Sequence, residues 1–210
     1  MSGVFVTFEG GEGSGKSTQV ARLAARLRAT GHDPLVTREP GGTPVGEGIR
    51  ALLLDHERRP SAMTEALLMV ASRAQLVGGV LRPALEAGRI VLCDRYGDST
   101  LAYQGGGRGV EHALLVELNR AATGGLVPAV TLLFDVPVPV GLDRRHASAG
   151  ATNRLDREPA EFHERVRARY LELAAAEPER WRVLDGTVGE NELEARVWEA
   201  VGPRLALARS

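Results

Sequence analysis

The segment Gly10-Gly11-Glu12-Gly13-Ser14-Gly15-Lys16-Ser17 limits the folds open to this chain more than any other. It has the pattern Gly-x-x-x-x-Gly-Lys-Ser and stands between a short apolar run and a helix-periodic segment, as a phosphate-binding loop requires. Glycines let successive backbone N–H groups turn toward phosphate oxygens, and the N-terminus of the following helix adds partial positive charge. The segment therefore predicts a strand, a loop and a helix that bind an ATP-type nucleotide.

Lys16 is the only lysine among the 26 lysine and arginine residues. A compact ammonium acts on a phosphate as a point charge, and a planar guanidinium replaces it poorly. We expect Lys16 to contact the β and γ phosphates as a catalytic residue, and the Ser17 hydroxyl to help hold Mg²⁺. The predicted ATP-binding residues of the loop are Gly10, Gly11, Glu12, Gly13, Ser14, Gly15, Lys16, Ser17 and Thr18.

Five apolar runs rich in β-branched residues predict strands at residues 4–8, 34–37, 90–93, 130–134 and 181–184. Segments rich in alanine, leucine and arginine predict helices at residues 17–29, 62–87, 110–121 and 160–176. Strands that are apolar throughout suit a parallel sheet covered on both faces. We predict an α/β fold of the P-loop NTPase type, a doubly wound sheet of about five parallel strands with helices on both faces, in a single domain spanning residues 1–210.

Ligands of such sheets bind beyond the carboxyl ends of the strands, and four of the predicted strands end at or beside an acid: Glu9, Asp94, Asp135 and Asp185. Three polar or glycine-rich segments, at residues 38–47, 103–109 and 143–158, are the predicted active-site loops. The last of them contains a short predicted lid at about residues 143–157.

Charge and hydropathy narrow the expected partners. The net charge of -1 provides no long-range field for nucleic acid, so we expect no nucleic-acid partner. No apolar run of about 18 residues is present, so we expect no membrane partner and a cytoplasmic protein. Cys93 is the only cysteine and lies in an apolar run, which predicts a buried, inert thiol and no internal disulfide.

Two features narrow the class of P-loop protein. An Asn-Lys-x-Asp element that reads guanine cannot exist here, because Lys16 is the only lysine; this disfavours a GTPase switch. The predicted strand that ends at Asp94 is followed by Arg95, where many ATPases carry a second acid that positions water. An arginine at this place favours binding of a second anion.

Several blocks in combination resemble the bacterial thymidylate kinase family. They are Thr37-Arg38-Glu39-Pro40-Gly41-Gly42-Thr43, Asp94-Arg95-Tyr96, residues 99–109, Arg154-Leu155-Asp156 and Phe162-His163-Glu164-Arg165-Val166. The resemblance extends from about Phe5 to Asp185. It implies an ATP- and Mg²⁺-dependent kinase that phosphorylates dTMP to dTDP in dTTP biosynthesis. It also implies a homodimer formed through the long helix at residues 62–87.

The resemblance assigns roles around the two phosphate groups. Arg38, Arg50 and Arg95 correspond to positions around the dTMP phosphate, and Arg95 is also predicted to be catalytic. Asp94 corresponds to a position that holds Mg²⁺ directly or through water, and Glu9 is expected to orient Mg²⁺-bound water. Glu12 corresponds to an acid that accepts a hydrogen bond from the 3′-hydroxyl of dTMP.

The resemblance also implies a base pocket. Arg73 corresponds to the residue that donates to the thymine carbonyl, and Tyr103 to the residue packed under the deoxyribose. The candidates for the remaining polar edge of the base are Ser99, Thr100 and Gln104. Met69 stands where relatives often have a phenylalanine that stacks on thymine, and its thioether either covers the base or belongs to the core.

The predicted lid carries four arginines on a backbone rich in alanine, glycine and serine, and we expect it to be flexible and to close over ATP. Arg145 and Arg154 are the predicted catalytic arginines, and Arg144 is predicted to cover the adenine. Gly13 stands where some relatives carry a catalytic arginine in the loop itself, so we expect the lid to supply that charge. Gly13→Arg should then restore activity to a protein whose lid arginines are neutralised.

Two alternatives remain open from the sequence. Met69 keeps open a kinase for another nucleoside monophosphate or for a deoxynucleoside. A regulatory module that binds nucleotide without turnover is the other, and Arg95 together with the arginine-rich lid argues against it.

Overall fold

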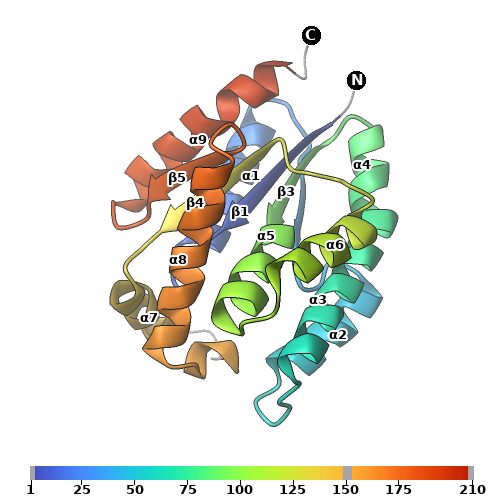
Figure 1. Cartoon of the computed structure of the whole chain (residues 1–210). Coiled ribbons are helices and arrows are strands. Elements are labelled where there is room, and N and C mark those ends of the chain that lie inside the picture. The colour runs from blue at the N-terminus through green and yellow to red at the C-terminus, as the bar shows by residue number, and fades with distance from the viewer. Residues whose placement is uncertain (1–2, 149–152, 208–210) are drawn as a thin grey trace.

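Five parallel strands form one sheet in the order β2-β3-β1-β4-β5 (Figure 1). The structure is a computed structural model that describes residues 3–148 and 153–207. The strands are β1 (Val4–Glu9), β2 (Leu35–Arg38), β3 (Ile90–Asp94), β4 (Val130–Asp135) and β5 (Trp181–Asp185). All five lie within one residue of their predicted limits, so the predicted parallel sheet is confirmed.

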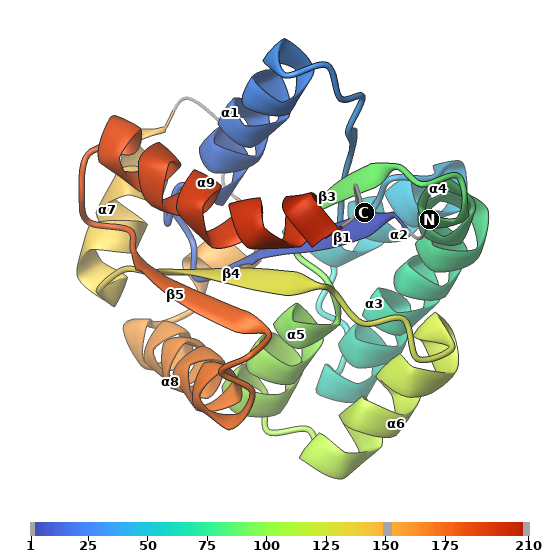
Figure 2. The same cartoon turned by 90° about the horizontal axis from the view of Figure 1, so that it is seen from above.

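Helices cover both faces of this sheet (Figure 2). On one face lie α1 (Lys16–Ala29) and α9 (Glu190–Leu207). On the other face lie α3 (Ala62–Leu76), α5 (Gly97–Thr100) and α8 (Ala160–Ala176), with α6 (His112–Thr123) against α3. The core on the α1 side joins Phe8, Leu23 and Val197, whereas α8 contributes Phe162 and Tyr170 to the core on the other side. Cys93 is buried, as predicted.

The long predicted helix at residues 62–87 is present but changes its winding. A π-helical turn at Val77–Leu81 separates α3 from α4 (Arg82–Glu86). Pro83 lacks the N–H that would bond to Gly79 in a regular α-helix, which accounts for the wider turn at this point.

The predicted loop at residues 103–109 is wrong, because a π-helical segment occupies Leu101–Gly107. Its glycines allow close packing against α8 rather than an irregular path. A Cβ atom on Gly106 would lie 2.7 Å from the Cβ of Arg169, and one on Gly107 would overlap the ring of Phe162. This contact brings Tyr103, at 3% exposure, to the edge of the site.

The other two predicted loops also contain regular structure. Helix α2 (Pro44–Leu54) begins inside the first, with Pro44 at its start and the Thr43 hydroxyl accepting a hydrogen bond from the Gly46 N–H at 3.0 Å. Helix α7 (Val138–Ala147) runs into the predicted lid, which therefore starts as a helix and not as a flexible loop. The lid resumes with a 3₁₀ turn at Leu155–Arg157. Residues 149–152 of the predicted lid lie outside the described residues.

A membrane-crossing helix would need more length and apolar character than any helix within residues 3–148 and 153–207 has.

Candidate active site

A cavity of about 930 Å³ opens at the carboxyl ends of the strands. Its walls come from the phosphate loop, the start of α1, the ends of β2 and β3, the last turn of α7 and the turn after β5. The charged residues that line it include Glu12, Lys16, Arg38, Arg50, Asp94, Arg95, Arg144 and Arg145. Segments far apart in the sequence thus converge on one cleft with an excess of positive charge.

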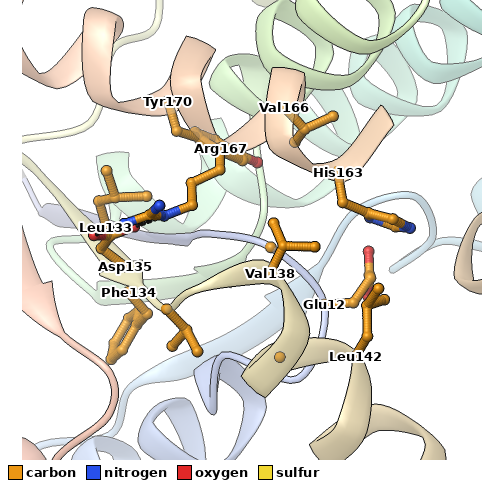
Figure 3. Close-up of a pocket in the computed structure, with 13 residues that line it drawn as sticks. Glu12, Leu133, Phe134, Asp135, Val138, Leu142, His163, Val166, Arg167 and Tyr170 are labelled. Atoms are coloured by element: carbon orange, nitrogen blue, oxygen red, sulfur yellow. Dashed lines mark hydrogen bonds and ion pairs between the residues drawn. The ribbon is translucent and has the colours of Figure 1, made fainter. Parts of the chain in front are cut away.

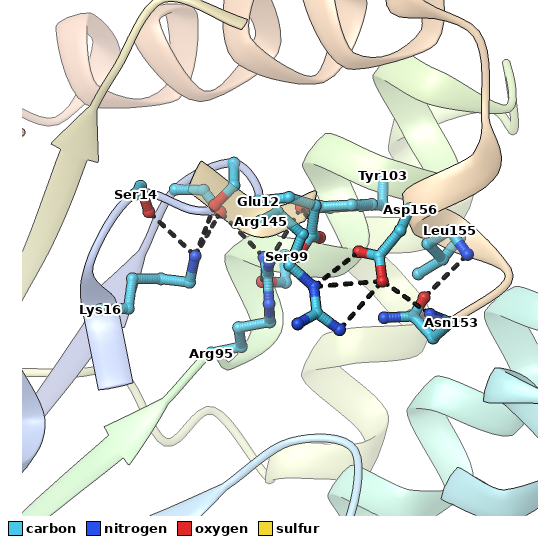
Figure 4. Close-up of polar contacts among 12 residues, drawn as sticks. Glu12, Ser14, Lys16, Arg95, Ser99, Tyr103, Arg145, Asn153, Leu155 and Asp156 are labelled. Carbon is cyan, nitrogen blue, oxygen red and sulfur yellow. Dashed lines mark hydrogen bonds and ion pairs between the residues drawn. The ribbon is translucent and has the colours of Figure 1, made fainter. Parts of the chain in front are cut away.

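The phosphate loop turns into α1 at Gly15, whose φ of 89° lies in the left-handed region that favours glycine. The Lys16 ammonium folds back over the loop and donates to the carbonyl oxygens of Gly10 and Gly11 at 3.1 and 2.6 Å and to the Ser14 hydroxyl at 3.0 Å (Figure 4). Burial, and after it the charge of Arg95, lowers the pKa of Lys16 to about 8. The ammonium lies directly at the loop that would receive phosphate.

The Ser17 hydroxyl donates to a carboxylate oxygen of Asp94 at 2.5 Å. These are hard oxygen ligands, and Mg²⁺ commonly takes only one or two such groups from a protein and completes its shell with water and phosphate oxygens. Among the described residues, no group of three or more histidine, cysteine or acidic side chains could hold a metal by itself. The pair fits a cation that arrives together with phosphate.

Glu9 is not part of this pair, contrary to the expectation that it orients Mg²⁺-bound water. Its side chain is completely buried and does not line the cavity. The carboxylate accepts hydrogen bonds from the Tyr96 backbone N–H, the Ser99 hydroxyl and the Tyr170 hydroxyl. It faces inward because α5 and α8 close over the end of β1.

Arg95 ties three elements together beside the loop. One terminal nitrogen, Nη2, donates to Glu12 Oε1 and to the Tyr103 hydroxyl, both at 2.9 Å, and the other, Nη1, donates to the Gly10 carbonyl at 3.0 Å (Figure 4). The Tyr103 hydroxyl in turn donates to Glu12 Oε1 at 2.7 Å. Burial by itself would raise the pKa of Glu12, but Arg95 and then Lys16 outweigh it and lower the pKa to about 2. Glu12 is therefore an ionised hydrogen-bond acceptor at neutral pH.

Two further arginines face the cavity from the β2 side. Arg38 Nη2 donates to both carboxylate oxygens of Glu47, at 2.9 and 3.0 Å, and Arg50 Nη1 donates to the Pro40 carbonyl at 2.9 Å. Burial, and after it the charge of Arg38, lowers the pKa of Arg50. Positive charges crowd at this end of the cleft, as a site for a second anion requires.

The predicted base-pocket residues lie in the wall behind the cavity and do not line it. Arg73 is completely buried and donates to Glu39, Thr100, Asn119 and the Tyr96 carbonyl. The predicted contact of Arg73 with a base carbonyl would therefore have to replace one of these protein contacts. Burial of a guanidinium requires such partners, and the carboxylate of Glu39 supplies the opposite charge.

The remaining candidates in this wall differ in their bonding. Gln104 donates its Nε2 to Glu65 at 2.7 Å, and its buried Oε1 has no hydrogen-bond partner among the described residues. Ser99 is turned toward Glu9, away from the expected base edge. Met69 is 8% exposed on α3, which fits both the core and the base-covering interpretation.

The lid arginines go to different places. Arg145 lines the cavity and pairs with Asp156, whose carboxylate oxygens lie 3.0 to 3.1 Å from its Nε and Nη2 atoms. Arg144 lines the same cavity and donates to the Gly186 carbonyl at 2.7 Å, in the turn after β5. Arg154 instead lines a separate cavity and donates to Glu65 at 2.5 Å and to the Leu53 carbonyl at 3.3 Å. The structure brings one of the two predicted catalytic lid arginines to the loop and not the other.

Gly13 marks a close contact between α7 and the phosphate loop. Its φ is +63°, and a Cβ atom there would overlap the Gly141 carbonyl oxygen. A Cβ on Gly141 would lie 2.5 Å from the Glu12 carbonyl oxygen. This arrangement argues against a rescue by Gly13→Arg, which stays a prediction, because backbone occupies the space that the new side chain needs.

Several residues around this cleft have no role predicted from the sequence. Asp156 and His163 stand inside the family-like blocks, which was the available signal for them. Figure 3 shows His163 and Glu12 facing one another across a small cavity of about 20 Å³, close to Leu142. Tyr170 and Gly141 had no sequence signal of their own, since an aromatic residue or a glycine in a helix usually has a packing role.

Comparison with known proteins identifies close relatives. Residues 8–197 match the family model described as thymidylate kinase. The chain is 58% identical over 198 residues to a thymidylate kinase of Thermomicrobium roseum, a match that covers 94% of this chain and 93% of that protein. It is 54% identical to one of Deinococcus radiodurans, over 96% and 98% of the two chains. The crystal structure of thymidylate kinase from Ehrlichia chaffeensis is similar with a TM-score of 0.77 at 30% identity, over 96% of this chain and 99% of that one.

Proposed function

This chain belongs to the thymidylate kinase family, and we propose that it transfers the γ-phosphoryl group of ATP to dTMP, giving dTDP for dTTP biosynthesis. The observation that carries this proposal is the single cleft in which the phosphate loop faces Arg38, Arg50 and Arg95. Two phosphorylated substrates can meet there end to end. Phosphoryl transfer depends mainly on such positioning and on stabilisation of charge, so no covalent enzyme intermediate is needed.

The phosphate loop would bind ATP, the phosphoryl donor. Its backbone N–H groups and the N-terminus of α1 would bind the phosphates of ATP. The Lys16 ammonium would exchange the carbonyl oxygens of Gly10 and Gly11 for phosphate oxygens. Arg144, anchored on Gly186, would lie over the adenine.

Three arginines and Glu12 would bind dTMP, the phosphoryl acceptor. Arg38, Arg50 and Arg95 would surround the dTMP phosphate, and the ionised Glu12 would accept a hydrogen bond from the 3′-hydroxyl. The pKa of Glu12 of about 2 supports this role, because the carboxylate remains an acceptor throughout the neutral pH range. Tyr103, bonded to both Arg95 and Glu12, would pack under the sugar.

Mg²⁺ would bind at Ser17 and Asp94, which already lie together at the cleft. Once bound, it would neutralise charge on the transferring phosphoryl group. Arg145 is the lid arginine that we assign to the same group from the opposite side, because it lines the cavity while Arg154 does not.

We further propose that the base enters between α3 and the π-helical segment Leu101–Gly107. The Oε1 atom of Gln104 supports this site: it is a buried acceptor with no hydrogen-bond partner in the part of the chain that the structure describes, and it suits a base N–H group. Thr100 and Arg73 lie in the same wall, and Met69 would cover the face of the base.

Two proposals concern the setting of the enzyme. We propose a homodimer formed through α3, supported by the exposed apolar side chains of Met63 and Leu67 on that helix and of Leu52 on the adjacent α2. We also propose a cytoplasmic location, where ATP and deoxynucleotides are available.

The decisive experiment measures ADP release with ATP, Mg²⁺ and each nucleoside monophosphate in turn. We expect dTMP to be the preferred acceptor, with little turnover of CMP, AMP, GMP or thymidine. A preference for another acceptor would replace dTMP in the proposal. Nucleotide binding without any turnover would overturn the kinase activity itself.

A further inference from the structure

Glu9 is a buried carboxylate that the proposed reaction does not use. It ends β1 with no exposed surface, and both of its oxygens are engaged inside the protein. The Tyr96 backbone N–H donates to Oε1 at 2.8 Å, and the hydroxyls of Ser99 and Tyr170 donate to Oε2 at 2.5 and 2.8 Å. Burial, followed by the nearby charge of Asp98, raises its pKa to about 7. A carboxylate in such a place is unfavourable for folding, which suggests a functional reason for it.

The two hydroxyl groups that donate to Glu9 also face Arg95. Arg95 Nη1 lies 3.4 Å from the Ser99 hydroxyl and 3.3 Å from the Tyr170 hydroxyl. The two hydroxyl oxygens also lie 2.8 Å from each other. Whichever neighbour each hydroxyl donates to, its oxygen keeps a lone pair that can accept from the guanidinium. The chain of contacts runs from β1 through α5 and α8 to the residue that follows β3.

Arg95 needs such support because its backbone is held in an unfavourable conformation. Its φ of 69° makes it the one non-glycine residue in the described part of the chain with a positive φ. Residues in this region keep their conformation only when the surrounding structure enforces it. Hydrogen bonds to Glu12 and Tyr103 hold Nη2 in place. The direction of Nη1 is set by its contacts with the Gly10 carbonyl and with the hydroxyls of Ser99 and Tyr170.

We infer that Glu9, Ser99 and Tyr170 form a positioning relay that sets the direction in which Arg95 presents its guanidinium to the acceptor phosphate. The three residues act through Arg95 and do not themselves touch the substrate. This inference rests on the proposed function for the identity of the anion that Arg95 binds. The geometry of the relay itself does not depend on that identity.

Tyr170→Phe tests the relay by removing one hydroxyl while keeping the ring in the core. We expect kcat/KM for dTMP to fall about tenfold, the usual effect of losing a hydrogen bond to a charged group, with the KM for ATP unchanged. Tyr96→Phe is the matched control, because its hydroxyl donates to the Leu126 carbonyl and not to Arg95. Both variants should melt cooperatively, and we expect the control to keep its kcat/KM within about twofold. Equal kcat/KM values for Tyr170→Phe and the unaltered enzyme would overturn the relay.

A double-mutant cycle separates positioning from a general structural effect. In an Arg95→Gln background, Tyr170→Phe should lower kcat/KM by less than about twofold, because the group that the hydroxyl directs is gone. A second tenfold loss in that background would show that Tyr170 acts independently of Arg95, and it would overturn the inference.

Nuclear magnetic resonance of the Arg95 guanidinium gives a readout that needs no turnover. We expect its Nη1 protons to rotate slowly in the unaltered protein and several times faster in Tyr170→Phe, with no change in Tyr96→Phe. Equal rates in all three proteins would overturn the relay. If the relay appears in these spectra while dTMP is not phosphorylated, the proposed substrate fails and the relay stands. If dTMP is phosphorylated and Tyr170→Phe has no effect, the relay fails and the proposed substrate stands.

Discussion

At the level of single residues, two neighbouring charged groups of the site have pKa values that are shifted for different reasons. The Lys16 ammonium and the Glu12 carboxylate share the phosphate loop, and Arg95 acts on both. Burial lowers the pKa of Lys16 most, and the Arg95 guanidinium lowers it further. Burial would raise the pKa of Glu12, but the same guanidinium opposes this effect and helps to lower that pKa. The loop thus keeps an ionised carboxylate, proposed to accept from a substrate hydroxyl, beside a cation that is proposed to bind phosphate.

Lys16→Met should affect the chemical step far more than acceptor binding. We expect kcat to fall about 10²- to 10³-fold, the usual loss when one charge that stabilises a transition state is removed. Binding of dTMP, measured by calorimetry, should change less than about threefold, because three arginines surround the proposed acceptor site. Equal losses in kcat and in dTMP affinity would contradict this division.

The lowered pKa of Lys16 can be measured directly, since its side chain is the only lysine amine in the chain. The neutral amine reacts with acylating reagents, so the extent of Lys16 acylation should rise with pH around a midpoint of about 8. Because the folded pKa lies below the unfolded value of 10.5, this group also makes the folded state relatively more stable as the pH rises between the two values. Mass spectrometry after brief labelling gives the midpoint; a value near 10.5 would refute the shift.

At the scale of elements, α7 decides which lid arginine meets the loop. The helix carries Arg144 and Arg145 in its last turn and rests on the loop at the contact between Gly13 and Gly141. Arg154 lies beyond the gap in the described lid and is held on Glu65 of α3. Proximity in sequence did not distinguish these arginines, but the course of the helix does.

Arg145→Ala and Arg154→Ala form a matched pair that tests this assignment. We expect kcat to fall about 10²-fold or more for Arg145→Ala, because the lost charge would face the transferring group in the proposed complex. Arg154→Ala should lower kcat by less than about tenfold, since that side chain pairs with Glu65 in another cavity. Steady-state assays with saturating ATP and dTMP decide between them, and the reverse order would show that Arg154 enters the site during turnover.

Gly141→Ala tests the contact of α7 with the loop. The added methyl group would lie 2.5 Å from the Glu12 carbonyl oxygen, so the helix must shift away and take Arg144 and Arg145 with it. We expect kcat to fall about tenfold or more, as misplacement of catalytic groups by an ångström commonly does. Gly48→Ala in α2 is the control: outside its own helix, no atom of the described residues lies within 4 Å of the new methyl group, and stability should rise by about 0.5 to 1 kcal/mol. Unchanged turnover for Gly141→Ala would contradict the proposed role of the contact.

At the scale of the whole molecule, the sheet order β2-β3-β1-β4-β5 places the ends of β2 and β3 beside the phosphate loop that follows β1. Arg38 therefore reaches the cleft from β2 and Asp94 from β3, although they are 56 residues apart in the sequence. The face formed by α2 and α3 lies outside this cleft and carries the exposed apolar residues Leu52, Met63 and Leu67.

The proposed dimer predicts a sedimenting mass of twice the 22.4 kDa of the chain at micromolar concentration. Leu67→Glu should shift the equilibrium toward the monomer, because it places a charge on a face that would become buried. Val183→Glu is a matched control, since this side chain is 51% exposed on β5 at the opposite edge of the sheet. A monomer for the unaltered protein would refute the proposal.

The sheet, the phosphate loop and the family could all be predicted from the amino-acid sequence, because they depend on local patterns. Apolar runs predicted all five strands within one residue, and the loop from Gly10 to Ser17 is a contiguous pattern with its own chemistry. Gly106 and Gly107 were misjudged, since their close packing on α8 depends on a helix more than 50 residues away.

The partners of the long charged side chains could be learned only from the folded molecule. Arginine has several rotatable bonds, so its sequence position leaves the guanidinium free to reach many partners, and only the surrounding fold selects one of them. Glu9 points inward because α5 and α8 cover it. Arg73 is enclosed by Glu39 and Asn119. Arg145 and Arg154 line different cavities. Backbone patterns are local, whereas the partners of buried charges are brought together from distant parts of the chain.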